Sequence, residues 1–133
     1  VLYGRYESGS LNLIPLAGTA VYNGVLNYPE ILFNVISFIP FGMYMEMLFR
    51  KASWFTNLGI ILLVSLVFEV WQFVFLLGIA DITDLLANGF GGAIGINIMY
   101  VLTSIWREKA YSRVNILCLS ATVFVILITY LTL

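Results

Sequence analysis

The sequence predicts an all-α, polytopic transmembrane helix bundle, and its composition and segment lengths support this fold class. Of 133 residues, 62% are hydrophobic and 10% are charged, and the mean hydropathy is +1.01, whereas about half of a soluble domain is apolar. Four segments are long and apolar enough to span a bilayer: 31–49, 58–80, 85–106 and 114–133. We therefore expect a single membrane domain over residues 1–133. Because the chain begins with Val1 rather than Met, a fifth, N-terminal span could precede it.

The composition also excludes several functional classes. The net charge of −1 offers no basic patch for nucleic acid. The chain has no histidine, which rules out a Ser-His or Cys-His nucleophile pair and a histidine metal ligand within it. No motif implies a cofactor, and Cys118 is expected to be a small core residue. Any chemistry must use carboxylates, amides, hydroxyls or a bound metal.

The distribution of basic residues predicts the orientation of the spans. Five of the six lie between the first and second or the third and fourth spans: Arg50, Lys51, Arg107, Lys109 and Arg113. The positive-inside rule makes these loops cytoplasmic. We therefore predict a multi-pass membrane protein, with the Asp81–Asp84 turn and the C-terminus outside.

The segment before the first span, residues 4–30, mixes Gly, Asn, Ser and Pro with short apolar runs. It is too broken to span a membrane and too apolar for a free loop. Non-helical backbone at membrane depth is tolerated only where protein or water covers it. The sequence therefore predicts an interfacial or re-entrant segment that caps the outer face of the bundle.

In the first predicted span, Asn34 and Ser37 lie one helical turn apart on one face. Pro40 interrupts the hydrogen-bond ladder further along, and Gly42 permits a bend. Glu46 lies about 120° from Asn34 around the helix and four residues before Arg50. We expect an ion pair between them that reaches the inner surface, outside any site.

The second predicted span carries Glu69 near its middle, where a carboxylate costs about 2.5–3.5 kcal/mol on insertion scales. Ser65 and Gln72 share its face. An intramembrane acid predicts a functional site, with Glu69 as the candidate catalytic residue. The alternative is a protonated Glu69 that makes one structural hydrogen bond.

The third predicted span has the densest polar pattern. One face carries Asp81, Asp84, Asn88, Gly91, Gly92 and Gly95 within an arc of roughly 100°. Gly91 and Gly95 form a seam where another helix can approach closely. Asp81 is either a helix cap or a site residue, and it is with Asp84 a weak candidate for binding a hard divalent cation. Arg5, the only outer basic residue, is predicted to pair with one of these two acids.

Together these side chains predict an outward-facing polar vestibule. Asn34 and Asn88 lie shallow in it, Ser37 and Gln72 lower, and Glu69 at its floor, when the rise is counted from the outer ends of the spans.

Four motifs resemble the VanZ-like family in order and spacing. They are Asn12-Leu-Ile-Pro15, Asn34 followed by Phe38-Ile-Pro-Phe-Gly42, Glu69-Val-Trp-Gln72, and Asp81-Ile-Thr-Asp84-Leu-Leu-Ala-Asn88-Gly-Phe-Gly-Gly-Ala-Ile-Gly95. The resemblance marks Arg5, Asn12, Pro15, Asn34, Pro40, Gly42, Glu69, Gln72, Asp81, Asp84, Asn88 and Gly92 as signature positions. Two departures stand out: Leu16 replaces a frequent Phe, and Gly78-Ile-Ala80 lacks the Arg that often precedes the acidic motif.

What the resemblance implies is an integral protein of the bacterial cytoplasmic membrane that is linked to low-level resistance to teicoplanin-type glycopeptides, without an established mechanism. We expect it to bind an amphiphile in the outer vestibule, either a lipid-linked wall precursor or a lipid-tailed antibiotic such as teicoplanin. Membrane lipids are the other expected partners. The alternatives are an intramembrane enzyme that uses Glu69 and a metal held by Asp81 and Asp84, and a small proton or ion translocator with Glu69 as relay.

Overall fold

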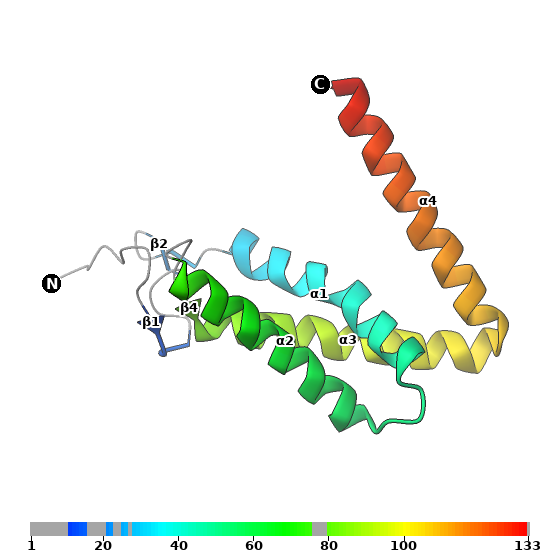
Figure 1. Cartoon of the computed structure of the whole chain (residues 1–133), viewed down its shortest axis with the longest axis horizontal. Coiled ribbons are helices and arrows are strands. Elements are labelled where there is room, and N and C mark those ends of the chain that lie inside the picture. The colour runs from blue at the N-terminus through cyan, green and yellow to red at the C-terminus, as the bar shows by residue number, and fades with distance from the viewer. Residues whose placement is uncertain (1–10, 16–20, 23–24, 27, 76–79, 133) are drawn as a thin grey trace, which may run out of the picture. The chain divides into compact units, whose positions relative to one another are not determined.

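The computed structural model describes the chain except for residues 1–10, 16–20, 23–24, 27, 76–79 and 133. Four helices dominate it (Figure 1): α1 (Tyr28–Leu48), α2 (Trp54–Val74), α3 (Ile82–Trp106) and α4 (Lys109–Thr132). Each contains a window long and apolar enough to cross a membrane. The predicted class, an all-α polytopic membrane bundle, is confirmed.

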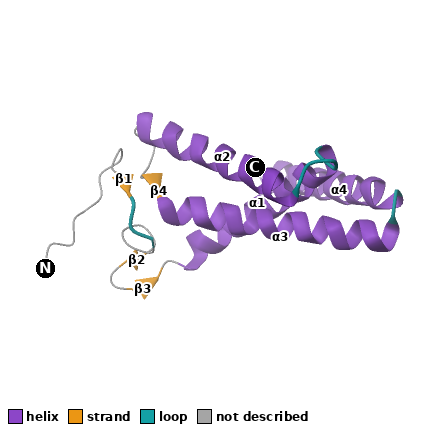
Figure 2. Ribbon diagram, turned by 90° about the horizontal axis from the view of Figure 1, so that it is seen from below, coloured by secondary structure: helices purple, strands orange, loops and turns teal. Residues whose placement is uncertain are grey.

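Among the described residues, four strands of two residues each pair into two small ladders. β1 (Leu11–Asn12) pairs in parallel with β4 (Ala80–Asp81), and β2 (Val21–Tyr22) pairs antiparallel with β3 (Val25–Leu26). The β1–β4 ladder brings the segment before the first helix next to the start of α3 (Figure 2). Leu11 lies opposite Ala80, and Asn12 lies opposite Asp81.

The chain divides into two compact units, Val1–Asn97 and Ile98–Leu133. In the second unit, Arg107 follows α3 with a left-handed φ of 50°, a conformation that favours glycine. Its N–H donates to the Thr103 carbonyl at 2.9 Å. The Arg113 guanidinium lies 4.8 Å from the Trp106 ring centroid, a cation–π contact.

In the first unit, α1 and α3 approach so closely that three glycines are required at the contact. A Cβ added at Gly42, Gly91 or Gly95 would collide with backbone of the facing helix. Gly91 and Gly95, the predicted seam, therefore face α1. Pro40 lies inside α1, which continues past it, as membrane helices allow.

A second pair of helices, α2 and α3, packs with side chains of α2 against glycines of α3. A Cβ at Gly92 would lie 2.7 Å from Ile61 Cγ2. Ile61 is fully buried and forms an apolar core with Met45 and Ile96. Side chains from α1, α2 and α3 thus meet at one level of the first unit.

The ends of the helices differ from the predicted spans. The second predicted span, 58–80, becomes α2 from Trp54 to Val74. The helix begins early because the Ser53 hydroxyl caps it by accepting from the Thr56 N–H at 3.1 Å. Ala80 instead lies in β4. The α3 and α4 helices also begin before the predicted residues 85 and 114, because polar first turns lower the hydropathy on which the spans rested.

Candidate functional site

Asp81 is the centre of a hydrogen-bond cluster at the end of the first unit where β1 and β4 pair, called here the β1–β4 end. Its Oδ1 accepts from the Thr83 N–H at 2.8 Å, which caps the N-terminus of α3. Its Oδ2 accepts from Asn12 Nδ2 at 3.0 Å. The sequence left open whether Asp81 is a cap or a site residue. The structure shows one oxygen capping the helix and the other holding Asn12.

Asn12 is positioned by its own turn as well as by Asp81. The Asn12 Oδ1 accepts from the Ile14 N–H at 3.2 Å, the local Asx turn typical of asparagine. Its side chain is 3% exposed. The predicted segment over residues 4–30 therefore contacts the bundle through this residue.

Glu69, on α2, reaches the same cluster. Its Oε2 accepts from the Asp81 backbone N–H at 3.0 Å, and the residue is 7% exposed. The acid that is least expected in a membrane span thus satisfies a backbone donor at the start of α3. This bond joins the β1–β4 ladder to α2.

A second amide–carboxylate pair joins α1 to α3. Asn34 Nδ2 donates to Asp84 Oδ1 at 2.6 Å. Asp84 lies in the first turn of α3, where a carboxylate is favoured by the helix dipole. The pair is short because the glycine seam between the same helices brings their backbones together.

One turn deeper, Asn88 on α3 meets Ser65 on α2. Asn88 Nδ2 donates to Ser65 Oγ at 2.9 Å, and both residues are buried. The Asn88 Oδ1 is buried and has no hydrogen-bond partner within the part of the chain that the structure describes. An acceptor in this state costs about 1–3 kcal/mol until a donor reaches it.

A small hollow opens beside these bonds. It has a volume of about 60 Å³ and is lined by Leu11, Asn12, Leu13, Leu66, Glu69, Asp81, Ile82 and Leu85. This volume holds a few waters or one small polar group. It is well below the size of a pocket that encloses a whole ligand.

The structure brings together five of the nine predicted ligand-binding residues in direct hydrogen bonds and adds a sixth below them. The bonded set at the top is Asn12, Asn34, Glu69, Asp81 and Asp84, and Asn88 lies one turn deeper. Ser37 and Gln72 are exposed and make no hydrogen bond in the described part of the chain. Arg5 lies outside the described residues, so its predicted pairing stays a prediction.

Sequence reasoning missed a second buried pair at the opposite end of the unit. Glu46 was predicted to extend to the inner surface with Arg50. The structure instead buries Glu46, and its Oε2 accepts from Asn57 Nδ2 at 2.8 Å. The charge of Arg50 still acts on Glu46, as predicted, but the carboxyl is buried and does not reach the surface. The reason is that α2 begins at Trp54, so that Asn57 lies within a helix and faces α1. Asn57, Ile61, Ser65 and Glu69 are the buried residues of α2, and their four-residue spacing was the signal that could have revealed the pair.

Comparison with known proteins agrees with the motifs in this site. The VanZ/LLP1 family model matches residues 3–107, which include every residue of the cluster. Protein VanZ of Enterococcus faecium is 34% identical over 128 residues, which are 96% of this chain and 75% of the enterococcal protein. No solved structure matches the chain. The family model and this relative both extend across most of the sequence, and the chain therefore belongs to the VanZ/LLP1 family.

Proposed function

We propose that this membrane protein binds an amphiphile at its β1–β4 end and thereby contributes to glycopeptide resistance. The ligand's polar group would enter the hollow between Glu69 and Asp81. Its hydrocarbon tail would lie along α2. Lipid-linked wall precursors and lipid-tailed glycopeptides such as teicoplanin both have this shape, and membership of the VanZ/LLP1 family supports the link to resistance.

The observation that carries the proposal is the position of Leu66 on α2. Leu66 lines the small hollow beside Glu69 and Asp81 and also lines an apolar groove of about 280 Å³. One side chain therefore lies between a small hollow that two buried acids help to line and a larger groove that is lined by apolar residues alone. An amphiphile has the same division, because its head needs hydrogen bonds and its tail needs apolar contact.

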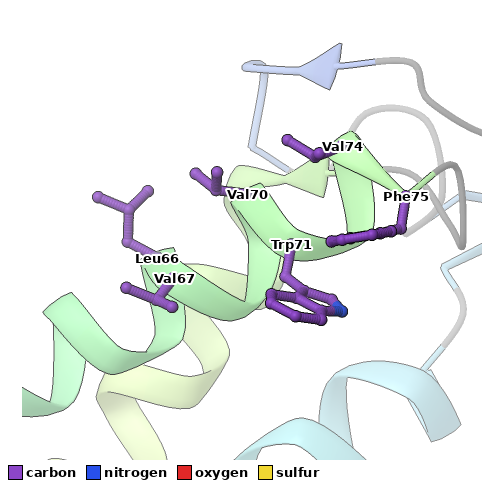
Figure 3. A pocket seen from close by; sticks show the side chains of 6 residues that line it. All are labelled: Leu66, Val67, Val70, Trp71, Val74 and Phe75. Carbon is purple, nitrogen blue, oxygen red and sulfur yellow. The ribbon is translucent and has the colours of Figure 1, made fainter.

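The groove runs along the last turns of α2, as Figure 3 shows. Its lining is entirely apolar: Leu66, Val67, Val70, Trp71, Val74 and Phe75. The rings of Trp71 and Phe75 lie 4.5 Å apart between centroids, and together they form one wall. The groove is an open surface beside the hollow, which suits a tail that enters sideways from the bilayer.

The proposed orientation places this end of the protein outside the cytoplasmic membrane. The positive-inside rule assigns the loop with Arg50 and Lys51 to the cytoplasm. That loop follows α1 at the helix end opposite Asn34. The hollow would then open in the outer leaflet, where glycopeptides and exported wall precursors are found.

The experiment compares Leu66→Trp with Leu63→Trp. Leu63 is exposed on the same helix but lines neither the hollow nor the groove. The Trp side chain at position 66 should fill the junction, so purified protein should retain less amphiphile in native mass spectrometry, and the host should lose protection against teicoplanin. Leu63→Trp should behave as wild type. Equal retention and equal protection in both variants would refute the proposal.

Glu69→Gln tests the polar half of the same site. The amide can still accept from the Asp81 N–H, so membrane yield and thermal stability should stay close to wild type. Loss of retained amphiphile and of protection is expected, because the carboxylate charge is gone. A Gln variant with normal yield and full protection would return Glu69 to a structural role.

A further inference from the structure

We infer that the head group bound at the β1–β4 end is a cationic hydrogen-bond donor, such as a primary ammonium, and not a phosphate. This inference rests on the proposed amphiphile site and narrows its ligand. Three features of the described residues support it: the balance of charge, the balance of donors and acceptors, and the buried acceptor on Asn88.

Carboxylic acids gather at this end of the protein. Glu30, Glu69 and Asp81 all lie near enough to Asp84 for their charges to act on it. Arg5 is the only basic residue that the sequence predicts on the same side of the membrane as these four carboxylic acids. Even with Arg5 paired to one of the acids, as predicted, the acids outnumber the base by three. Each of these acids that is ionised would repel a phosphate and attract an ammonium group.

The hydrogen-bond groups show the same imbalance. The side-chain amides of Asn12, Asn34 and Asn88 all direct their NH₂ groups to protein oxygens, on Asp81, Asp84 and Ser65. One hydrogen of each of these three amides is therefore engaged within the protein. A phosphate accepts hydrogen bonds and has few to offer, whereas an ammonium group has three donors for the carboxylate oxygens.

Asn88 adds a buried acceptor to this end of the protein. The residue is 7% exposed, and its Oδ1 is buried without a partner in the described part of the chain. It lies one turn below Asp84, and its partner Ser65 lies one turn below Glu69. A donor that enters between the two carboxylates, directly or through one water, would satisfy this oxygen.

The test uses the full chain in nanodiscs of zwitterionic lipid, titrated with hexadecylamine or with hexadecyl phosphate. The two probes share one tail and differ in head group. Thermal stabilisation as a function of probe concentration gives an apparent Kd for each. We expect saturable binding of the amine and at least tenfold weaker binding of the phosphate.

Two variants test whether the amine binds at this site. Asn88→Ala should weaken amine binding about tenfold, the effect of losing one hydrogen bond to a charged group. Glu69→Gln should weaken amine binding at least as much. This second variant keeps the test valid if Asn88→Ala proves unstable. Asn97→Ala is the control, because the exposed Asn97 amide bonds only its own helix, at the Ala93 carbonyl.

The outcomes separate this inference from the proposed function. Phosphate binding as tight as amine binding, with both weakened by Glu69→Gln, would overturn the cationic head group and leave the amphiphile site standing. No saturable binding of either probe would overturn both. Amine binding that is unchanged in Asn88→Ala and Glu69→Gln would place the amine elsewhere and overturn the inference.

Discussion

The close contact between α1 and α3 predicts that Gly→Ala has opposite effects on stability at Gly91, which lies in the contact, and at Gly59, which does not. Gly91→Ala places a Cβ against the backbone of Val35 on α1. Gly59→Ala, on α2, places the same group where no atom lies within 4 Å. Both changes gain the same helix propensity, about 1 kcal/mol. Any difference between them therefore measures the packing at the seam.

The magnitude follows from the geometry of the contact. To restore an ordinary carbon–oxygen separation, α1 and α3 would have to move apart by more than roughly 1 Å, which forfeits much of the dispersion energy along the seam. Overpacking of this kind costs about 1–3 kcal/mol, occasionally more. The same movement stretches the Asn34–Asp84 hydrogen bond, now 2.6 Å long, and its loss adds about 1 kcal/mol. We expect a net destabilisation of about 1–3 kcal/mol for Gly91→Ala after the gain in propensity.

Thermal unfolding of the purified variants measures both effects. A change of 1 kcal/mol corresponds to a shift in Tm of a few degrees for a chain of this length. Gly59→Ala should raise Tm slightly, and Gly91→Ala should lower it and also weaken retention of the amphiphile. If both variants shift Tm in the same direction by the same amount, the close backbone contact does not exist and the reasoning fails.

Two further predictions concern orientation and the inner polar pair. In a Cys118→Ala background, Ile14→Cys should react with an impermeant thiol reagent in intact cells, and Ser53→Cys should not. Both positions are exposed, but the proposed orientation places them on opposite sides of the membrane. The reverse labelling pattern would invert that orientation. Asn57→Leu should lower stability by about 1–3 kcal/mol, because it leaves the buried Glu46 carboxyl without its donor. Leucine at both positions should recover most of that loss in thermal unfolding, and a double variant worse than Asn57→Leu alone would contradict this assignment.

Much of the fold follows from one physical requirement, that backbone in a membrane must satisfy its own hydrogen bonds. Hydropathy alone therefore located the four helices. Hydropathy misplaced the start of α2 because the polar side chain of Asn57 lowers the average and so excludes the first turn from the predicted span. The helix begins at Trp54 because Ser53 caps it. Hydropathy also misplaced the end of this span, because Ala80 lies in β4 and not in α2. The pairing of Ala80 with Leu11 joins residues 69 positions apart, and no local pattern reports such a contact.

The candidate site was predictable where its residues repeat along one helix. Asp81, Asp84 and Asn88 share a face of α3, and helical spacing alone places them together. Their partners could not be derived in this way. The bond from Asn12 to Asp81 depends on the β1–β4 register, and the bond from Asn34 to Asp84 depends on how closely α1 and α3 pack. Ser37 shares the face of Asn34 by spacing, but it is exposed, because spacing does not specify which arc of a helix a neighbour covers.

The buried face of α2 explains why the inner pair and the outer site should act independently. Asn57 and Ser65 are separated by eight residues, about 12 Å along the helix axis, and Ile61 lies between them in the apolar core with Met45 and Ile96. A hydrogen bond cannot bridge this distance, and the core leaves no polar side chain at that level of α2. The Glu46–Asn57 pair therefore stabilises the bundle without sensing the charge of Glu69. Substitutions in that pair should change the stability of the protein and leave the preference between an amine and a phosphate head group unchanged.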